Sequence, residues 1–302
     1  MAPINWTAKF STPPPKTSFT VLSYPAPNIL LVTLNRPKSL NCINVAGHHE
    51  LDAIWNWLDT EPALFVGIIT GNGRAFCAGA DLKGTFSVSI CSTPSPLRKI
   101  SRLIVYIEWN DSNSSDQTRP QAPPSGFGAL SRRTGLKPII AAVNGICFGG
   151  GTEMIVNCDM VVASKAATFA LPEVKRGVVA IAGAPPRLMR TVGKQRAMEM
   201  ALTGRVVPAE EAREWGLVNK VAEGDVVEAA VEMAKMVAEA SPDAVVVTRQ
   251  GVMVGWEGLS AEEGTRVWTE QWYPKLLAGE NMKEGVRAFV EKRKPRWNAA
   301  KL

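Results

Sequence analysis

One stretch, residues 139–173, constrains the fold more than any other part of this 302-residue chain. An apolar segment at 139–143 is predicted to be a strand, and after a turn three consecutive glycines, at 149–151, open a helix. Glu153 lies in the first turn of that helix, and Glu173 follows twenty residues later (173 − 153). Glycine leaves backbone amides accessible, and beside two carboxyl groups such amides can polarise a carbonyl and support proton transfer next to it.

A second glycine-rich turn, Arg74-Ala-Phe-Cys-Ala-Gly-Ala-Asp-Leu-Lys83, follows another predicted strand. Neither turn contains the Gly-Lys-Ser/Thr of a P-loop or the Gly-x-Gly-x-x-Gly of a dinucleotide site. Small residues at Ala78, Gly79, Gly149 and Gly150 let a ligand approach the backbone closely. Two unpaired amides that converge on one oxygen form an oxyanion hole. We interpret the two turns as the two halves of such a hole; the alternative is that they are two ordinary glycine turns.

Composition limits the other classes of function. Hydrophobic residues make up 46% of the chain, which excludes a disordered protein, and the apolar runs are too short to span a bilayer. The five cysteines lack metal-clip spacing and the two histidines, His48 and His49, are adjacent, which argues against zinc and against histidine-dependent nucleophilic catalysis. The net charge of +6 is dispersed, which suits a phosphate-bearing small molecule better than nucleic acid.

Alternating strand and helix patterns predict an α/β fold. Strands are expected at 29–34, 64–69, 139–143 and 160–163, and a helix at 45–58. The repeated order of strand, glycine turn and helix predicts stacked units rather than one doubly wound sheet. The later part of the chain is predicted to be helical, with helix starts at Pro208, Ser241 and Ser260. We therefore expect a core at 18–205 and a C-terminal helical region at 206–302.

Three segments depart from this pattern. Residues 1–17 are rich in proline and lack acidic residues, so we expect a flexible N-terminal arm. Residues 85–136 are rich in Ser, Pro, Asn and Asp, so we expect most of them to form an inserted, mobile loop. The chain ends in Ala300-Lys301-Leu302, one small-residue exchange away from the peroxisomal address Ser-Lys-Leu. This ending predicts recognition by the peroxisomal import receptor; the mitochondrion and the cytoplasm are the alternatives.

Seven short motifs, in order along the chain, are similar to those of the crotonase superfamily, the enoyl-CoA hydratase/isomerase family. They are Leu34-Asn-Arg-Pro-Lys38, Phe76-Cys-Ala-Gly-Ala-Asp-Leu-Lys83, Ala141-Ala-Val-Asn-Gly145, Gly149-Gly-Gly-Thr-Glu153, Leu171-Pro-Glu173, Thr203-Gly204 and Ala288-Phe-Val-Glu-Lys-Arg-Lys294. The resemblance covers about residues 19–294 apart from the insertion. It implies a crotonase-type spiral of ββα units followed by a C-terminal helical trimerisation region, and hence a homotrimer or a hexamer made of two trimers.

The resemblance also implies the residues of the site. Ala78 and Gly150 would supply oxyanion-hole amides to the thioester carbonyl of an acyl-CoA, and Glu153 and Glu173 would be the catalytic carboxyls. The expected substrate-binding residues are Ala80, Asp81, Leu82, Lys83, Ile181 and Lys292. Asp81 is expected to hold its own loop. Lys83 is expected to contact CoA, with a solvated lysine as the alternative, and Lys292 to meet a CoA phosphate from a neighbouring subunit, with a basic helix end as the alternative. No metal or redox cofactor is expected, because coenzyme A is part of the substrate.

The two glutamates can divide acid and base roles only if their surroundings separate their pKa values. Glu153 is expected to stay ionised at a helix N-terminus and to act as the base. Glu173, among apolar neighbours in the sequence, is expected to hold a proton more easily and to act as the acid. The alternatives are an ordinary helix-start residue for Glu153 and an ion pair of Glu173 with Lys175 or Arg176.

Ile181 departs from the family pattern, because many hydratases have a glycine there that helps to position the water. A smaller, more apolar pocket is expected, and the sequence does not identify the acyl group of the substrate. The favoured hypothesis is hydration of a 2-enoyl-CoA to a 3-hydroxyacyl-CoA in fatty-acid β-oxidation or related acyl-CoA metabolism. An isomerase, a dehydratase or a thioester hydrolase on the same scaffold, and a non-catalytic CoA-binding protein, are the alternatives; two glutamates favour hydration.

Overall fold

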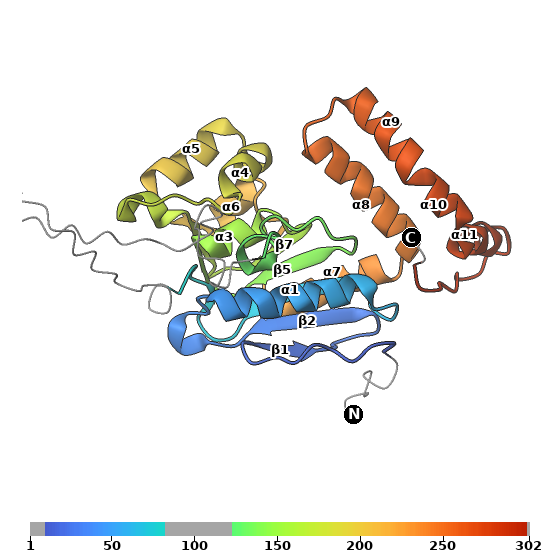
Figure 1. Cartoon of the computed structure of the whole chain (residues 1–302), viewed down its shortest axis with the longest axis horizontal. Coiled ribbons are helices and arrows are strands. Elements are labelled where there is room, and N and C mark those ends of the chain that lie inside the picture. Colours follow the sequence, from blue (N-terminus) through green and yellow to red (C-terminus); the bar gives the residue numbers. More distant parts are fainter. Residues whose placement is uncertain (1–9, 82–122, 301–302) are drawn as a thin grey trace, which may run out of the picture.

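The fold is built on two β-sheets, shown with their helices in the computed structural model of Figure 1. The structure describes residues 10–81 and 123–300. The larger sheet has the order β1-β2-β3-β5-β7-β10, and all of its neighbouring strands are parallel except β1, which is antiparallel to β2. Its strands are Thr20–Ser23 (β1), Ile29–Leu34 (β2), Val66–Gly71 (β3), Ile139–Val143 (β5), Met160–Ser164 (β7) and Lys220–Ala222 (β10).

The smaller sheet has the order β4-β6-β8-β9, in which β4, β6 and β8 are parallel and β9 is antiparallel to β8. Its strands are Ala75–Cys77 (β4), Ile146–Phe148 (β6), Thr168–Ala170 (β8) and Val207–Pro208 (β9). In each of the pairs β3–β4, β5–β6 and β7–β8, the first strand joins the larger sheet and the second joins the smaller one. The chain therefore advances in repeated units, and the prediction of stacked units in an α/β fold is confirmed.

The larger sheet is buried on both faces. Leu30 and Val32 pack into the cluster that contains the inner face of α1 (Val45–Thr60). Ile29 and Leu31 point the other way and pack into the cluster formed with α7 (Val226–Ala238). Burial on both faces explains why these strands appear in the sequence as continuous apolar runs instead of alternating ones.

The remaining helices form two groups. Those after the smaller sheet's strands are η3 (Phe127–Ala129), α3 (Gly150–Ile155), η4 (Pro172–Arg176), α4 (Ala184–Val192), α5 (Lys194–Thr203) and α6 (Ala209–Glu214); a short turn, η2 (Pro37–Ser39), follows β2. The C-terminal group is α8 (Pro242–Trp256), α9 (Ala261–Gln271), α10 (Tyr273–Ala278) and α11 (Glu280–Val290), which Figure 1 shows at the opposite end from α4 and α5. Ser241 and Ser260 cap α8 and α9 with their side chains, so both predicted helix starts are confirmed.

Across residues 10–81 and 123–300, no helix is both long enough and apolar enough to cross a bilayer.

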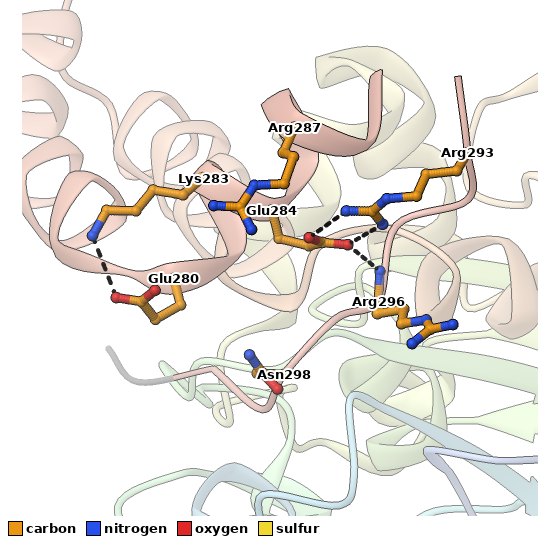
Figure 2. Close-up of a pocket in the computed structure, with 7 residues that line it drawn as sticks. All are labelled: Glu280, Lys283, Glu284, Arg287, Arg293, Arg296 and Asn298. Atoms are coloured by element: carbon orange, nitrogen blue, oxygen red, sulfur yellow. Dashed lines mark hydrogen bonds and ion pairs between the residues drawn. The ribbon is translucent and has the colours of Figure 1, made fainter. Parts of the chain in front are cut away.

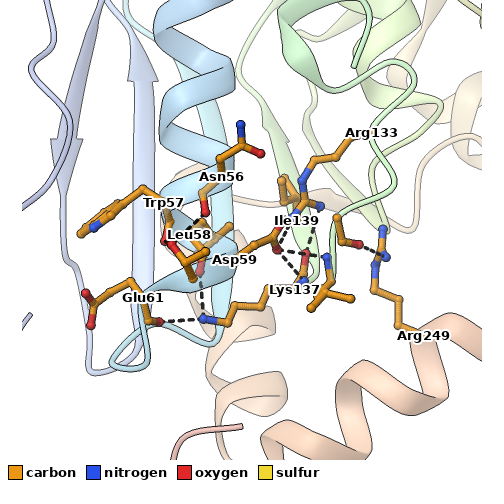
Figure 3. Close-up of polar contacts among 12 residues, drawn as sticks. Asn56, Trp57, Leu58, Asp59, Glu61, Arg133, Lys137, Ile139 and Arg249 are labelled. Carbon is orange, nitrogen blue, oxygen red and sulfur yellow. Dashed lines mark hydrogen bonds and ion pairs between the residues drawn. The ribbon is translucent and has the colours of Figure 1, made fainter. Parts of the chain in front are cut away.

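A buried polar network joins α1, the start of β5 and α8 (Figure 3). The Lys137 ammonium donates to two backbone carbonyls at the end of α1, at 2.7 and 2.8 Å, and burial lowers its pKa to about 8. Arg133 pairs with Asp59 at 2.6 Å, and Arg249 of α8 pairs with Asp159 at 2.6 Å. These contacts satisfy buried charges and attach the C-terminal helices to the core.

The predictions for two segments, the N-terminal arm and the insertion, are partly wrong. Residues 1–9 and 82–122 lie outside the described part of the chain, but Phe10 packs against Tyr24 and Trp57, with ring centroids 4.9 and 5.2 Å apart. Residues 123–136, expected to be loop, include the buried turn η3, whose Phe127 and Ala129 join the core against α1. A composition average over the whole segment hides these few apolar anchors.

Candidate active site

The three-glycine turn joins β6 to α3, and each of its glycines has a close neighbour. Gly149 has a positive φ of 56°, and its amide donates to the Ala170 carbonyl of β8 at 2.9 Å. A Cβ atom on Gly151 would overlap the carbonyl of Cys77, and one on Gly150 would overlap the ring of Phe127. The glycines therefore bring β4, β8 and η3 against the start of α3.

The turn after β4 corrects one predicted role. The amide of Ala78 donates to the Leu40 carbonyl at 3.0 Å, so it is occupied and contradicts the expected oxyanion donor. Ala80 forms a parallel β-bridge with Ile43. In this bridge the Ile43 amide donates to the Gly79 carbonyl, and the Ile43 carbonyl accepts the Asp81 amide. The Ala80 amide must therefore point away from Ile43, and within the described ranges no acceptor pairs with it.

The same turn approaches the start of α3. A Cβ atom built on Gly79, whose φ is +99°, would lie 3.4 Å from the Gly150 amide nitrogen. Gly150 is the first residue of α3, where backbone amides have no partner within the helix. Ala80 and Gly150 thus each contribute an amide that has no backbone acceptor in the described ranges, one from each turn, and the oxyanion role expected of Gly150 stays a prediction.

Asp81 is held by an ion pair with Arg36, 2.7 Å from nitrogen to oxygen. Arg36 also donates to the Cys42 carbonyl at 2.9 Å, so it joins the turn after β2 to the turn after β4. Asp81 therefore has a structural contact, made to a neighbouring turn and not within its own loop, and its expected part in substrate binding stays a prediction. Leu82 and Lys83, the next two predicted substrate-binding residues, lie outside the described part of the chain.

Glu153 is the most deeply buried acid of the site, with 4% of its surface exposed. One carboxylate oxygen accepts the Ala184 amide at 3.3 Å, at the N-terminus of α4. Burial raises the pKa of Glu153 to about 7; the amides of Ala182, Gly183 and Ala184 oppose the rise, and the charge of Glu173 adds to it. The expectation that α3 keeps Glu153 ionised is therefore wrong, because desolvation outweighs the helix N-terminus.

Glu173 enters the site from η4, directly after β8. Its Oε1 atom lies 2.9 Å from the position of a Cβ atom on Gly149, and its Oε2 atom is buried with no hydrogen-bond partner in the described ranges. Burial raises its pKa, against the lowering effects of its own amide and of Arg176. Lys175 donates instead to the Gly204 carbonyl at 2.7 Å, so the ion-pair alternative is not found in this part of the structure.

Three further titratable side chains, Cys77, Cys147 and His48, are buried near the two glycine turns or η3. The thiols of Cys77 and Cys147 are fully buried, which raises their pKa values, and they pack as small apolar groups. His48 is also buried; burial lowers its pKa to about 3, and its Nδ1 atom accepts the Gly128 amide at 2.9 Å. His48 is therefore a neutral packing residue. In the described ranges, no group of three metal-ligating side chains gathers.

Ile181 lies in the segment next to Glu153, whereas Lys292 lies far from both glutamates. Ile181 precedes the Ala182–Ala184 amides that face Glu153, but its side chain is 55% exposed. Lys292 follows α11, which Figure 1 shows at the far end of the chain from α3. The contact expected of Lys292, with a CoA phosphate bound to a neighbouring subunit, therefore stays a prediction.

A separate cavity of about 610 Å³ lies beside α11 (Figure 2). Its lining is entirely polar: Glu280, Lys283, Glu284, Arg287, Arg293, Arg296 and Asn298. Glu280 pairs with Lys283 at 3.3 Å, and Glu284 pairs with Arg293 at 2.7 Å. Ligand pockets for carbon chains have mostly apolar linings, so this cavity is not the site of an acyl group.

Sequence reasoning missed the supports of the site. Phe127, which packs on Gly150, lies at the end of the segment expected to be loop. The Ala182–Ala184 amides precede a helix that has proline in its first turn, and this Gly-Ala-Pro pattern is a helix-start signal that could have been used. Neither the pairing of these amides with Glu153 nor the pairing of Ala78 with Leu40 has a local signal.

Two buried carboxyls with raised pKa values, beside two glycine turns with accessible amides, define a site for acid–base chemistry next to a polarised carbonyl. A family model described as "Enoyl-CoA hydratase/isomerase" matches residues 26–95 and 128–300, well over half of the chain. The chain therefore belongs to the enoyl-CoA hydratase/isomerase family, the crotonase superfamily. The two matched ranges leave out 96–127, which falls within the predicted insertion.

Known proteins agree with this family. The chain is 52% identical, over 93% of its length and 96% of the other, to a mevalonyl-coenzyme A hydratase of Aspergillus fumigatus. It is 48% identical, over 97% and 99%, to a mevalonyl-coenzyme A hydratase of Beauveria bassiana. The crystal structure of an enoyl-CoA hydratase from Mycobacterium tuberculosis is similar, with a TM-score of 0.76, 33% identity, and coverage of 93% and 98%. The predicted crotonase fold and hydratase class are confirmed.

Proposed function

We propose that the chain adds water to a 2-enoyl-CoA thioester, and removes it in reverse, using Glu153 and Glu173 as its acid–base pair. The observation that carries this proposal is the raised pKa of both buried carboxyls next to the start of α3. A carboxyl whose pKa lies near 7 can both take up and release a proton at physiological pH. An acid at the surface or in a structural ion pair is not expected to be buried with a raised pKa.

The amides of Ala80 and Gly150 are assigned to the thioester oxygen. Hydrogen bonds from both amides draw electrons from the conjugated double bond, so the β-carbon becomes electrophilic and the negative charge that develops on the oxygen is stabilised. Ala80 replaces Ala78 in this role, because the Ala78 amide is already bonded to Leu40. Loss of one such donor typically lowers kcat by about 10²–10³-fold.

Glu153 is assigned as the base and Glu173 as the acid. In the hydration direction, Glu153 takes a proton from water as the water oxygen bonds to the β-carbon, and the thioester becomes an enolate. Glu173 then delivers its proton to the α-carbon, and the thioester carbonyl is restored. The charge of Glu173 raises the pKa of Glu153, so ionisation of one carboxyl favours protonation of the other.

The substrate is proposed to be mevalonyl-CoA and its dehydrated enoyl-CoA. Two relatives with this name match almost the whole chain at 52% and 48% identity. Mevalonate carries a hydroxyl and a methyl group on carbon 3, so its thioester has the β-hydroxyl that the glutamate pair would remove. A relative from Proteus mirabilis, 34% identical, is by its name a dehydratase of another acyl-CoA ester, carnitinyl-CoA. The proposed substrate is therefore branched at carbon 3, unlike the straight-chain acyl groups of fatty-acid β-oxidation.

The test mixes the purified protein with mevalonyl-CoA, or with crotonyl-CoA in the opposite direction. Ultraviolet absorbance of the conjugated thioester should appear with mevalonyl-CoA and disappear with crotonyl-CoA. Glu153→Gln and Glu173→Gln should each abolish most of the change. Binding of both esters without any absorbance change in the wild type would overturn the enzymatic proposal in favour of a CoA-binding protein.

A homotrimer, or a hexamer of two trimers, is proposed for the assembly. Phe289 and Val290 at the end of α11 are 86% and 73% exposed, and Val286 on the same helix is 60% exposed. Exposed apolar groups clustered on one helix are typical of interaction surfaces. Light scattering after gel filtration should give three or six times the 32.6 kDa chain mass, and Phe289→Asp should lower it.

Peroxisomal import through the receptor for Ser-Lys-Leu-type ends is proposed from Ala300-Lys301-Leu302, of which Lys301 and Leu302 lie outside the described residues. Relatives named as mitochondrial enoyl-CoA hydratases, from Dictyostelium discoideum and Pongo abelii, supply the alternative location. An N-terminal fluorescent fusion should label peroxisomes, and removal of the last three residues should disperse it. Mitochondrial labelling by a C-terminal fusion would favour the alternative.

A further inference from the structure

Ser131 is a fully buried hydroxyl that connects two separate supports of the site. Its oxygen accepts the backbone amide of Phe127 at 2.8 Å, and its hydroxyl donates to the carbonyl of Ala182 at 2.8 Å. A serine hydroxyl has a single proton to donate, and here it is directed to Ala182. The side chain therefore joins the turn η3 to the loop before α4, across 51 residues of sequence.

The Phe127 end of this connection leads to the proposed oxyanion site. The Phe127 ring packs so closely on Gly150 that a Cβ atom there would overlap it. Neighbours of Phe127 are also held in place: the Trp55 indole donates to the Gly128 carbonyl at 3.2 Å, and Gly128 donates to His48. The position of the Phe127 backbone, which Ser131 sets, therefore limits where the Gly150 amide can lie.

The Ala182 end leads to Glu153. The amides of Ala182, Gly183 and Ala184 face its carboxylate, and the Ser131 bond holds the carbonyl of the first of these residues. Ser131 also lies close to this loop through its own backbone, since a Cβ atom on Gly183 would be 3.4 Å from the Ser131 carbonyl oxygen. The orientation of the amides around Glu153 therefore depends on the Ser131 hydroxyl.

A second brace keeps the same loop in place but does not touch Ser131. Arg187 of α4 donates to the Asn157 side chain at 2.9 Å, and Asn157 donates to the Leu130 carbonyl at 2.7 Å. This brace keeps α4 and the η3 segment together when the Ser131 hydroxyl is removed. Substitution of Ser131 should consequently alter local geometry without separating the two elements.

We propose that Ser131 is a positioning residue that sets the Gly150 amide and the Glu153 carboxyl in register with each other. The proposal rests on the function proposed above and deepens it, because it names the group that couples the oxyanion donor to the base. Ser131 touches neither the substrate nor the reacting atoms, and it acts through Phe127 and through the Ala182–Ala184 amides.

The protonation of Glu153 also depends on the charged and titratable side chains around it. Glu173 is the charged group that acts on it, and it raises the pKa of Glu153. The elements packed against α3 also carry these titratable or charged side chains: Cys77, Cys147, Arg187 and Arg190. The two thiols stay neutral, because burial raises their pKa values. None of these groups is altered by a change at Ser131.

The test compares Ser131→Ala and Ser131→Cys with Ser131→Thr, which keeps a hydroxyl. Loss of the hydroxyl should lower kcat about 10- to 100-fold and leave KM for the acyl-CoA within about twofold, because misplacement of catalytic groups affects the chemical step. The matched control is Thr70→Val, which removes an equally buried hydroxyl bond, 2.8 Å to the Ala142 carbonyl, in β3. This control should lose stability without a change in kcat.

A second readout does not need turnover. The infrared carboxyl band that disappears in Glu153→Gln reports the protonation of Glu153, and its midpoint should move to higher pH in Ser131→Ala as the stabilising amides lose their orientation. Ser131→Thr and Thr70→Val should keep the wild-type midpoint. An unchanged midpoint and an unchanged kcat in a folded Ser131→Ala or Ser131→Cys would overturn the positioning role. Absence of turnover in the wild type would overturn the proposed function and leave this infrared test in force.

Discussion

The Oε1 atom of Glu173 lies 2.9 Å from the place where a Cβ atom would stand on Gly149. The two residues are 24 positions apart (173 − 149), and the parallel pairing of β6 with β8 brings their segments side by side. Gly149 also has a positive φ, so two independent constraints require glycine at this position. The triple glycine is therefore needed to admit the second carboxyl as well as to expose an amide.

Gly149→Ala should reduce activity more than stability. The added methyl group meets the Glu173 carboxylate, which must move, and a displacement of about 1 Å can lower the rate about 100-fold. A side chain at this positive φ adds a backbone strain of about 1–3 kcal/mol. Turnover and urea unfolding measured on the same sample separate the two effects. Gly193→Ala is the matched control, because Gly193 has a φ of +82° with nothing within 4 Å, so it should lose stability alone.

Glu153→Gln should be more stable than the wild type above pH 7. Burial raises the pKa of Glu153 from 4.5 to about 7, so the folded state binds this proton more tightly than the unfolded state does. The favourable contribution is complete below pH 4.5 and is lost as the pH rises through 7, and each pKa unit corresponds to 1.36 kcal/mol. A glutamine keeps the acceptor for Ala184 without the charge. Unfolding at pH 8 should favour the variant by up to about 3 kcal/mol, and the gap should close toward pH 5.

The control for this stability effect is Glu214→Gln, at an exposed position on α6. It should leave the free energy of unfolding within about 0.5 kcal/mol of the wild type at pH 8 and at pH 5, because a surface substitution away from packed or paired groups changes stability little. A Glu153→Gln protein that is less stable than the wild type at every pH would contradict the burial argument. It would show that hydrogen bonds from the α4 amides to the charged carboxylate outweigh its desolvation.

Hydration activity should fall as the pH drops below about 7. The base must be ionised to take a proton from water, and Glu153 has a pKa raised to about 7. Because the Glu173 charge contributes to that rise, Glu173→Gln should move the midpoint of its residual activity to lower pH. Initial rates of enoyl-CoA hydration between pH 5 and 9 measure both midpoints. A flat profile across this range would reject Glu153 as the base.

The sequence predicts most of the fold because its signals are local and periodic. The strand at 139–143 and the caps Ser241 and Ser260 occur where the pattern indicates them, and the repeated turns predict stacked units. The end of the insertion is mispredicted for a physical reason. Phe127 and Ala129 are two apolar anchors within a polar segment, and they are buried only because α1 supplies a surface to cover them.

The site is predicted less completely, because its details depend on contacts between distant segments. The sequence proposes both glutamates, Gly150 and Ala78 for the site, but the structure pairs the Ala78 amide with a carbonyl and shows no backbone acceptor for the Ala80 amide in the described ranges. Which of these two amides is occupied depends on the carbonyl of Leu40, some forty residues earlier (78 − 40). The ionisation of Glu153 likewise depends on its burial, which proximity to a helix start in the sequence does not reveal.

Asp81→Asn should weaken the reaction by loosening the turn that carries Ala80. The ion pair of Asp81 with Arg36, at 2.7 Å, fixes this turn against the one after β2, and both side chains are mostly buried. Removal of one charge leaves the Arg36 guanidinium poorly compensated, which should lower stability by about 1–3 kcal/mol. Because the Ala80 amide is the proposed donor to the thioester oxygen, kcat should fall by about 10-fold or more.

The matched control for Asp81→Asn is Glu223→Gln, which breaks an ion pair of similar length with Lys165, 2.5 Å, at the surface. Exposed pairs contribute about 0–1 kcal/mol, so this variant should keep both its stability and its kcat. Arg36→Lys offers a second comparison, since a lysine keeps the charge but has a single nitrogen in place of the guanidinium that also donates to Cys42. Full activity of Asp81→Asn, with its stability lowered as expected, would show that the turn after β4 holds its shape without this ion pair, and that the Ala80 amide is positioned by the bridge to Ile43 alone.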